Sequence, residues 1–200
     1  MIIGYVLKGS HSNGGDFFTS YPPTVVCQYC GTALDSDYCP REMRIEKTKK
    51  FDVSFTDDLH QIYSAKFVDF CKQNFGIDMH EKRIETPAGT YYYYVPAEIL
   101  PYDSEDAKVD FIRPCAQCGG FEEVIGAYPV FLQERSIIKT GIFRTDLEFG
   151  SFRSKNFITI IGVEWYEILK NEKFKGIAFK PIHDDPWVEI NKKLAKLNKK

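Results

Sequence analysis

Hydrophobic and polar residues alternate along several short segments, which is the pattern of half-buried strands. In KFDVSF, residues 50–55, the alternation puts Phe51, Val53 and Phe55 on one face, which we expect to be buried. GIFRTDLEFG, residues 141–150, alternates in the same way and predicts a strand with one polar face. Further strands are expected at three apolar runs, residues 2–8, 157–161 and 177–182.

A longer segment, TDDLHQIYSAKFVDFCKQNFG at residues 56–76, has the spacing of an amphipathic helix. Thr56 or Asp57 can cap its start, and Gly76 can end it. Its predicted apolar stripe consists of Leu59, Ile62, Tyr63, Phe67, Phe70 and Cys71. Cys71 therefore reads as a small core residue.

The C-terminal third predicts a second helix from about Val163 to Lys173, in which Trp165, Ile168 and Leu169 are expected to be buried. The tail, HDDPWVEINKKLAKLNKK, is basic and amphipathic, and it forms either a final helix or a frayed end.

A hairpin is predicted from residues 77–85 and 90–95, turning at TPAG. The second strand carries four consecutive tyrosines, and side chains alternate along a strand. Tyr91 and Tyr93 therefore share one face of the strand, and Tyr92 and Tyr94 share the other. Two readings stay open: one pair is exposed as a partner-binding patch, or the strand is buried on both faces.

These elements predict an α+β fold with mixed or antiparallel sheets and a few helices. The chain has 200 residues, of which 44% are hydrophobic and 15% aromatic, so it can bury one sizeable core. We find no repeat, linker or domain boundary, and we expect a single domain over residues 1–200.

Charge and hydropathy limit the classes of function. The chain carries 26 Lys and Arg against 28 Asp and Glu, a formal net charge of -2, so no global field attracts it to phosphate backbones. The most apolar late run, FITIIGV, is far shorter than the roughly 20 residues of a membrane span. The N-terminus has no basic leader or cleavage pattern. We therefore expect a soluble, cytoplasmic protein.

The sharpest chemical signal is a pair of C-x-x-C-G motifs, CQYCG at Cys27 and Cys30 and CAQCG at Cys115 and Cys118. This spacing lets two sulfurs face one point across a tight turn, a zinc knuckle, and two knuckles supply the four thiolates of a tetrahedral Zn²⁺ site. Four protein ligands leave no open position, so the predicted zinc-ribbon-like site is structural. Buried or redox-active cysteines are the alternative.

The two knuckles are far apart in the sequence, with residues 31–114, or 84 residues, between Cys30 and Cys115. Knuckles of small zinc ribbons usually lie about 15 to 20 residues apart. We therefore interpret residues 40–110 as a large insertion that leaves and returns at the metal.

The remaining cysteines and the histidines are weaker candidates. Cys39 is a possible replacement ligand, although a partly buried thiol is the simpler reading. No two histidines are at ligand spacing, and we expect surface or capping roles for His11, His60, His80 and His183.

The paired motifs, together with FRTDLEFG and EWYEILKNEKFKGIAFKPI, resemble the bacterial double-CXXCG motif proteins. The terminal block is also similar to the end of several immunity-protein families, which protect a bacterium from toxins made by itself or its kin. The resemblance does not extend to residues 40–110. It implies a cytoplasmic, non-enzymatic protein that binds metal structurally and covers the active site of a cognate toxin, with a family role only for Cys27, Cys30, Cys115 and Cys118.

Three hypotheses follow, led by a zinc-stabilised protein-binding module of the immunity type. The second is a nucleic-acid-binding zinc-ribbon protein, whose phosphate contacts would come from the lysine-rich tail and from Arg41, Arg44, Lys47, Lys49 and Lys50. Glu42 and Glu46 dilute that patch, so we expect no nucleic-acid partner. The third is an enzyme such as a C-x-x-C oxidoreductase. The sequence has no P-loop, G-x-G-x-x-G, H-E-x-x-H or G-x-S-x-G motif, which argues against this hypothesis.

Overall fold

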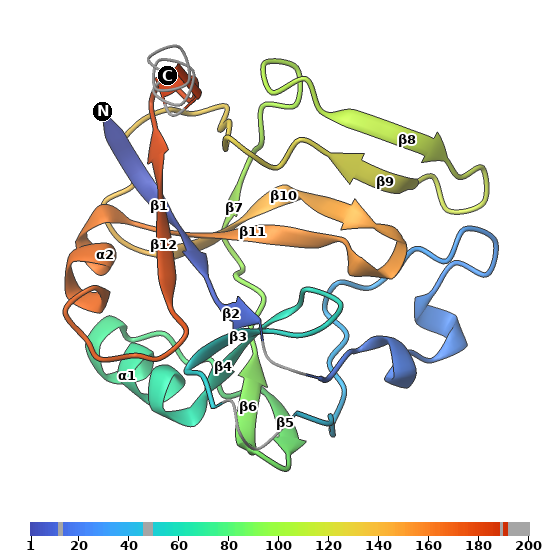
Figure 1. The fold of residues 1–200 in the computed structure, drawn as a ribbon. Coiled ribbons are helices and arrows are strands. Elements are labelled where there is room, and N and C mark those ends of the chain that lie inside the picture. The colour runs from blue at the N-terminus through green and yellow to red at the C-terminus, as the bar shows by residue number, and fades with distance from the viewer. Residues whose placement is uncertain (12–13, 46–49, 189, 192–200) are drawn as a thin grey trace, which may run out of the picture.

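The computed structural model describes residues 1–11, 14–45, 50–188 and 190–191. These residues form an α+β fold with two sheets and two α-helices (Figure 1), which confirms the predicted fold class. None of the helices in these ranges has the length and apolar character that a membrane crossing requires.

The larger sheet has seven strands in the order β12-β1-β11-β10-β9-β8, with β7 pairing β10 off this path. Its strands are β1 (Ile2–Lys8), β7 (Ile99–Leu100), β8 (Asp110–Pro114), β9 (Phe121–Ile125), β10 (Ile142–Ser151), β11 (Asn156–Ile161) and β12 (Ala178–His183). All neighbours are antiparallel except β7 and β10. The first strand of the chain therefore lies between two strands from its last third, β11 and β12.

The smaller sheet has five strands in the order β2-β3-β4-β6-β5. They are β2 (Ser10–His11), β3 (Val53–Phe55), β4 (Gln61–Ser64), β5 (Lys82–Thr86) and β6 (Gly89–Tyr93). Four of the five lie in the predicted insertion, residues 40–110, and β2 joins them from the N-terminal segment by pairing parallel to β3.

Helices α1 (Ala65–Phe75) and α2 (Val163–Leu169) lie on the same side of the molecule (Figure 1). Short 3₁₀ turns are η1 (Phe18–Ser20), η2 (Pro23–Val25) and η3 (Phe152–Ser154). Gly76 ends α1 as predicted, since its φ of 71° is left-handed and its N–H bonds the Lys72 carbonyl at 3.1 Å.

Three apolar clusters make up the core. The first joins both helices to both sheets and contains, among others, Leu7, Val53, Phe67, Ile161, Trp165 and Leu169. The second covers the opposite face of the larger sheet, with Ile3, Val6, Tyr102, Phe131 and Ile160. The third packs the smaller sheet against residues 17–45, with Phe17, Ile45, Ile62, Ile84, Tyr91 and Tyr93.

The predicted start of the first helix is wrong. Residues 61–64 form β4, which pairs with both β3 and β6, and the helix begins only after Ser64, whose Oγ accepts from the Phe67 N–H. Leu59 lies in the turn before β4 with φ 69° and is 46% exposed. A strand buried on both faces offers apolar residues at consecutive positions, so Ile62 and Tyr63 fitted the helical spacing by coincidence.

The second helix is shorter than predicted, because α2 ends at Leu169 rather than Lys173. Trp165 and Leu169 are buried as expected, but Ile168 is 42% exposed. Positions four residues apart share a helix face, and in so short a helix only that one face meets the core.

The alternating hydrophobic pattern also gave a wrong prediction for β3 and left two readings open for β6. In β3, Val53 and Ser54 are both buried and Phe55 is half-buried, because the strand lies between β2 and β4 and is covered on both faces. In β6, Tyr91 and Tyr93 enter the third cluster, while Tyr92 and the following Tyr94 pack against the first. The tyrosine strand is thus covered on both faces, and it presents no exposed tyrosine pair.

Candidate metal centre

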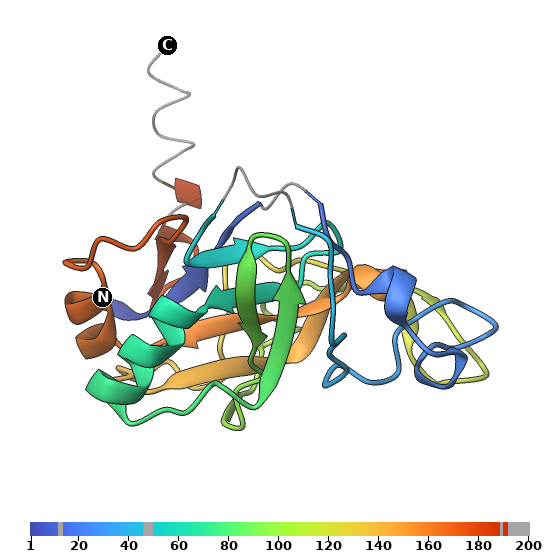
Figure 2. The ribbon, with the colours of Figure 1, turned by 90° about the horizontal axis from the view of Figure 1, so that it is seen from below.

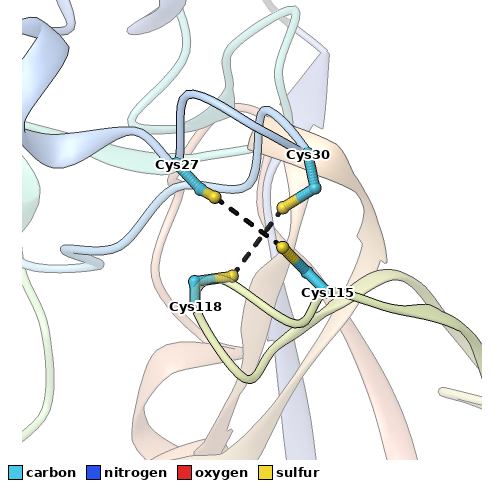
Figure 3. Close-up of side chains that lie close together, drawn as sticks. All are labelled: Cys27, Cys30, Cys115 and Cys118. Carbon is cyan, nitrogen blue, oxygen red and sulfur yellow. Dashed lines mark hydrogen bonds between the residues drawn. The ribbon is translucent and has the colours of Figure 1, made fainter.

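The four cysteines of the two C-x-x-C-G motifs meet at one point (Figure 3). Their sulfur atoms all lie within 4.8 Å of one another, although the cysteines of the two bonded pairs are 88 positions apart in the sequence. Cys27 Sγ is 3.8 Å from Cys115 Sγ, and Cys30 Sγ is 3.7 Å from Cys118 Sγ. Each short approach therefore joins one motif to the other.

The two motifs fold into the same turn. In the first, the Cys27 N–H donates to the Thr32 carbonyl and the Gly31 N–H donates to the Cys27 carbonyl, both at 2.8 Å. In the second, the Cys115 N–H donates to the Gly120 carbonyl at 2.8 Å and the Gly119 N–H to the Cys115 carbonyl at 2.9 Å. The glycine after each second cysteine takes the left-handed conformation that the turn requires, with φ of 75° and 72°.

Short antiparallel pairings hold both turns. Val26 and Ala33 form a bridge on either side of the first motif, just after η2. The second motif is the turn of the β8–β9 hairpin, where Pro114 pairs with Phe121. Both turns lie at the same end of the molecule in two perpendicular views (Figures 1 and 2).

The sulfur arrangement fits a tetrahedral metal ion. Four thiolates at the usual Zn–S distance of about 2.3 Å have sulfur–sulfur separations of about 3.8 Å. The Cys27–Cys115 and Cys30–Cys118 separations, 3.8 and 3.7 Å, match this value, and all six cysteines are free thiols. Cys27, Cys30 and Cys115 are buried and Cys118 is half-buried, so the centre is largely shielded from water.

The protein environment favours ionised sulfur at Cys30. Burial raises the pKa of this thiol, but hydrogen bonds with Thr32, Cys115 and Cys27 together outweigh burial and lower the pKa to about 6. A hydrogen bond with the Gly120 backbone lowers the pKa of Cys118, but burial and the other three thiols outweigh it and raise the pKa to about 11. A thiolate is the form that binds a metal.

A buried lysine connects the two motifs. Lys155, in the segment between η3 and β11, is 9% exposed, and its Nζ donates to Thr32 Oγ1 at 3.3 Å and to the Phe121 carbonyl. Burial lowers the pKa of Lys155, and the charges of Glu148, Cys30 and Cys118 oppose this effect. Four thiolates around a divalent ion carry a net charge of -2, which a neighbouring ammonium partly offsets.

Sequence reasoning missed Lys155. Its contacts with Thr32 and Phe121 span 123 and 34 residues, and no motif spacing relates the three positions. Only the packing of the β10–β11 end against both turns brings them together.

The other two cysteines lie outside the cluster. Cys39 is half-buried, with its Sγ 3.5 Å from the Pro40 carbonyl, so it does not replace a ligand. Cys71 is part of the first cluster, as expected. Burial raises the pKa of both thiols to about 12, which leaves them protonated and unreactive at neutral pH.

The prediction for His60 is wrong. This histidine is 3% exposed, stacks on Phe17 with ring centroids 4.2 Å apart, and has its Nε2 3.1 Å from Tyr21 Oη. The adjacent Asp58 is equally buried and accepts from the Phe17 N–H at 2.8 Å. Packing against Phe17 therefore buries His60, for which a surface or capping role was expected.

The other histidines lie near the surface. His80 contacts Asp69 and Asp78, and His11 lies 3.6 Å from Asp57. None of the four is in the metal-ligand cluster that the described residues form.

No family model, curated protein or solved structure matches this chain. The role of the centre therefore has to follow from its own residues.

Proposed function

We propose that this chain is a non-enzymatic protein-binding module stabilised by one structural Zn²⁺, held by Cys27, Cys30, Cys115 and Cys118 in a zinc-ribbon-like site. The observation that carries the proposal is the meeting of four sulfurs at separations suited to zinc. Bound there, zinc supplies a four-sulfur crosslink with no open position for a substrate. The ion therefore stabilises the fold and takes no part in a reaction.

Exposed apolar side chains near the two motifs support a binding role. Tyr29, between Cys27 and Cys30, is 78% exposed, and Leu34 is 53% exposed. Phe111 on β8 and Phe152 in η3 are also exposed, and these elements lie at the metal end of the molecule (Figures 1 and 2). We call Tyr29, Leu34, Phe111 and Phe152 the knuckle face. Exposed aromatic area of this kind is favoured at protein interfaces.

The partner we propose is a cognate bacterial toxin, and the proposed compartment is the cytoplasm. This step rests on the resemblance of the paired motifs and of the terminal block to double-CXXCG and immunity proteins. The net charge of -2 gives little long-range steering, so the complex would depend on apolar contacts such as those of the knuckle face.

Native mass spectrometry and co-purification test this proposal together. We expect one zinc per chain and a stable complex with the protein encoded by the adjacent gene. Tyr29→Ser should weaken that complex about tenfold or more while zinc is retained, because interface aromatics carry much of the binding energy. Ile137→Ser removes a side chain that is also exposed but lies outside the knuckle face, and it should leave binding unchanged. A chain without metal, or without affinity for the neighbouring protein, contradicts the respective half of the proposal.

A groove lined by lysines supports nucleic-acid binding as a second candidate function. Lys50, Lys66, Lys173 and Lys175 surround a cavity of about 380 Å³ beside the start of α1. Asp52 lies in the same groove, 3.9 Å from Lys66, and reduces its positive charge. Lys47, Lys49 and most of the basic tail lie outside the described residues. Retention on single-stranded nucleic acid that falls steeply with salt would favour this function over the first.

A further inference from the structure

A cavity of about 640 Å³ lies where the two sheets meet, away from the four cysteines. Residues of β1, β10 and β11, the end of β9 and the turn before β4 line it. Its walls are mostly apolar, and their principal side chains are Val6, Leu59, Val124, Phe149, Phe157 and Ile158. The size lies within the range of about 300–1,000 Å³ that is usual for sites of small molecules.

Among the described residues that line the cavity, one is charged: Lys8, the last residue of β1. Lys8 Nζ lies 4.2 Å from the centre of the Tyr128 ring, and Lys180 Nζ lies 4.0 Å from the same ring. Lys180 on β12 pairs with Val6 on β1, and Val6 is two residues before Lys8. Both ammonium groups therefore lie beside the Tyr128 ring. No carboxylate forms an ion pair with Lys8 in the described part of the chain.

Two of the polar side chains that line the cavity are already bonded to the protein. Gln61 Nε2 donates to Tyr63 Oη at 2.7 Å, and Asn156 Nδ2 donates to the Asp58 carbonyl at 3.1 Å. The interior therefore offers apolar contact and little hydrogen bonding, while the ammonium of Lys8 offers a positive charge. That combination suits a ligand with an apolar body and one negative group.

The electrostatics of Lys8 agree with this geometry. Burial, and then the nearby charge of Lys180, lower the pKa of Lys8. A negative group beside Lys8 would offset both effects, because it supplies a counter-charge for two neighbouring cations.

We propose that this cavity binds a small amphipathic carboxylate, with its apolar body against Phe149 and Phe157 and its carboxylate paired with Lys8. None of the four cysteines and none of the knuckle-face residues lines this site.

Isothermal titration calorimetry with three probes of matched chain length tests the proposed chemistry. Decanoate should bind, and decanol and decyltrimethylammonium should bind at least about tenfold more weakly, since only decanoate pairs with Lys8. Equal binding of all three probes, or binding of none, overturns the proposal.

Three variants test the proposed position. Lys8→Met keeps the aliphatic stem and should weaken decanoate binding about tenfold while leaving decanol unchanged. Lys139→Met removes an exposed lysine outside the cavity and should change nothing. Ala127→Trp places a large ring in the cavity and should abolish decanoate binding.

Circular dichroism and zinc content establish that each variant is folded. Decanoate binding that survives both Lys8→Met and Ala127→Trp in folded protein places the ligand elsewhere and overturns the proposal. Because the cavity contains none of the four cysteines, its failure would leave the proposed zinc site intact.

Discussion

The two-sheet body and the metal end of this protein are held together by different kinds of interaction. In the body, side chains such as Tyr63, Val68 and Ile160 are fully buried in apolar clusters that join strands from distant parts of the chain. At the metal end, the cluster around the two turns consists of the four cysteines themselves. Within the larger sheet, β9 pairs with β10 at two residues, Gly150 and Ser151, and Val124 of β9 packs into the second cluster.

Because of this difference, we expect different perturbations to destabilise the two regions. Apolar burial stabilises the body whether or not a metal is present. The cluster at the two turns consists of the four cysteines, so the proposed zinc crosslink between the sulfurs would be what holds the turns together. Selective loss of one region while the other persists is therefore the central expectation.

The largest effect is expected from Cys115→Ser. Removal of one ligand opens the site, and structural zinc contributes roughly 10 kcal/mol or more of apparent binding free energy in zinc-finger peptides. Native mass spectrometry should show the loss of zinc, and hydrogen exchange should show lost protection in residues 26–34 and 110–125, with β1 and β11 still protected. Cys39→Ser, which changes a thiol outside the cluster, should retain the metal. Hydrogen exchange that rises equally across the whole chain would mean that the body and the metal end do not lose structure separately.

Ile160→Ala tests the body. Ile160 is fully buried in the second cluster, and truncation of such a side chain costs about 2–5 kcal/mol. Urea denaturation should show this loss in the free energy of unfolding, while the folded fraction still binds one zinc. Ile168→Ala, at a 42% exposed position on α2, should cost less than about 0.5 kcal/mol. Similar losses for the two variants would mean that the packing of β11 is not as described.

Lys155→Met tests the connection between the regions. The change keeps the aliphatic stem but removes the charged donor to Thr32 Oγ1 and to the Phe121 carbonyl, at a cost of about 1–3 kcal/mol. The Phe121 carbonyl keeps only the long hydrogen bond from Thr32 Oγ1, at 3.4 Å. Zinc transfer to a chromogenic chelator should become faster, because the two turns separate more easily. Lys170→Met, which removes an exposed ion pair with Glu167, should not alter the transfer rate. An unchanged rate of zinc transfer for Lys155→Met would mean that the lysine does not help to hold the two turns together.

The body should also lose stability in acid through His60. Burial lowers the pKa of His60 in the folded protein to about 3, below its usual value of 6.5. The unfolded chain then binds the extra proton first, so the stability that His60 contributes is fully present above pH 6.5 and is lost as the pH falls toward 3. Asp58 beside it opposes this loss, because burial raises its pKa despite hydrogen bonds from Thr56 and Phe17.

The titration of His60 changes the free energy of unfolding by at most about 1.4 kcal/mol per pH unit. This change is measured as the difference in free energy of unfolding between the native chain and His60→Gln at pH 7, 6 and 5. Both proteins carry the same four cysteines, so acid release of zinc cancels in the difference. Parallel curves for the two proteins would refute the assignment.

The smallest effects come from a matched pair of glycines. Gly76 ends α1 with φ 71°, Gly119 lies in the second metal turn with φ 72°, and an added methyl group meets nothing within 4 Å at either position. Alanine should therefore cost only backbone strain, about 1 kcal/mol. For Gly76→Ala the cost should appear in the free energy of unfolding, and for Gly119→Ala as about fivefold weaker zinc affinity. Equal changes in both measurements for both variants would mean that the two regions are not separable.

The two cysteine turns could be predicted from sequence because the information that specifies each turn is local. A C-x-x-C-G turn is fixed by six residues, and its backbone hydrogen bonds recur unchanged at Cys27 and Cys115. The same holds for the end of α1 at Gly76 and for the β5–β6 hairpin, whose turn lies at the predicted residues.

Features that depend on distant parts of the chain could not be predicted. The burial of His60 depends on Phe17 and Tyr21, and the position of Lys155 depends on both metal turns. The true start of α1 depends on the pairing of β4 with two other strands, which no local spacing encodes. Apolar periodicity reports which side chains seek a core, but not which strand lies beside them.

The separation of the two cysteine turns along the chain also orders events during synthesis. The ribosome completes Cys27 and Cys30 long before Cys118 exists, so the first turn leaves the exit tunnel as a dithiol without its partners. Over that interval an oxidant can attack the pair or a competing ion can occupy it. The nascent chain thus passes through a stage at which its first two proposed zinc ligands depend on the reducing and metal-buffering capacity of their surroundings.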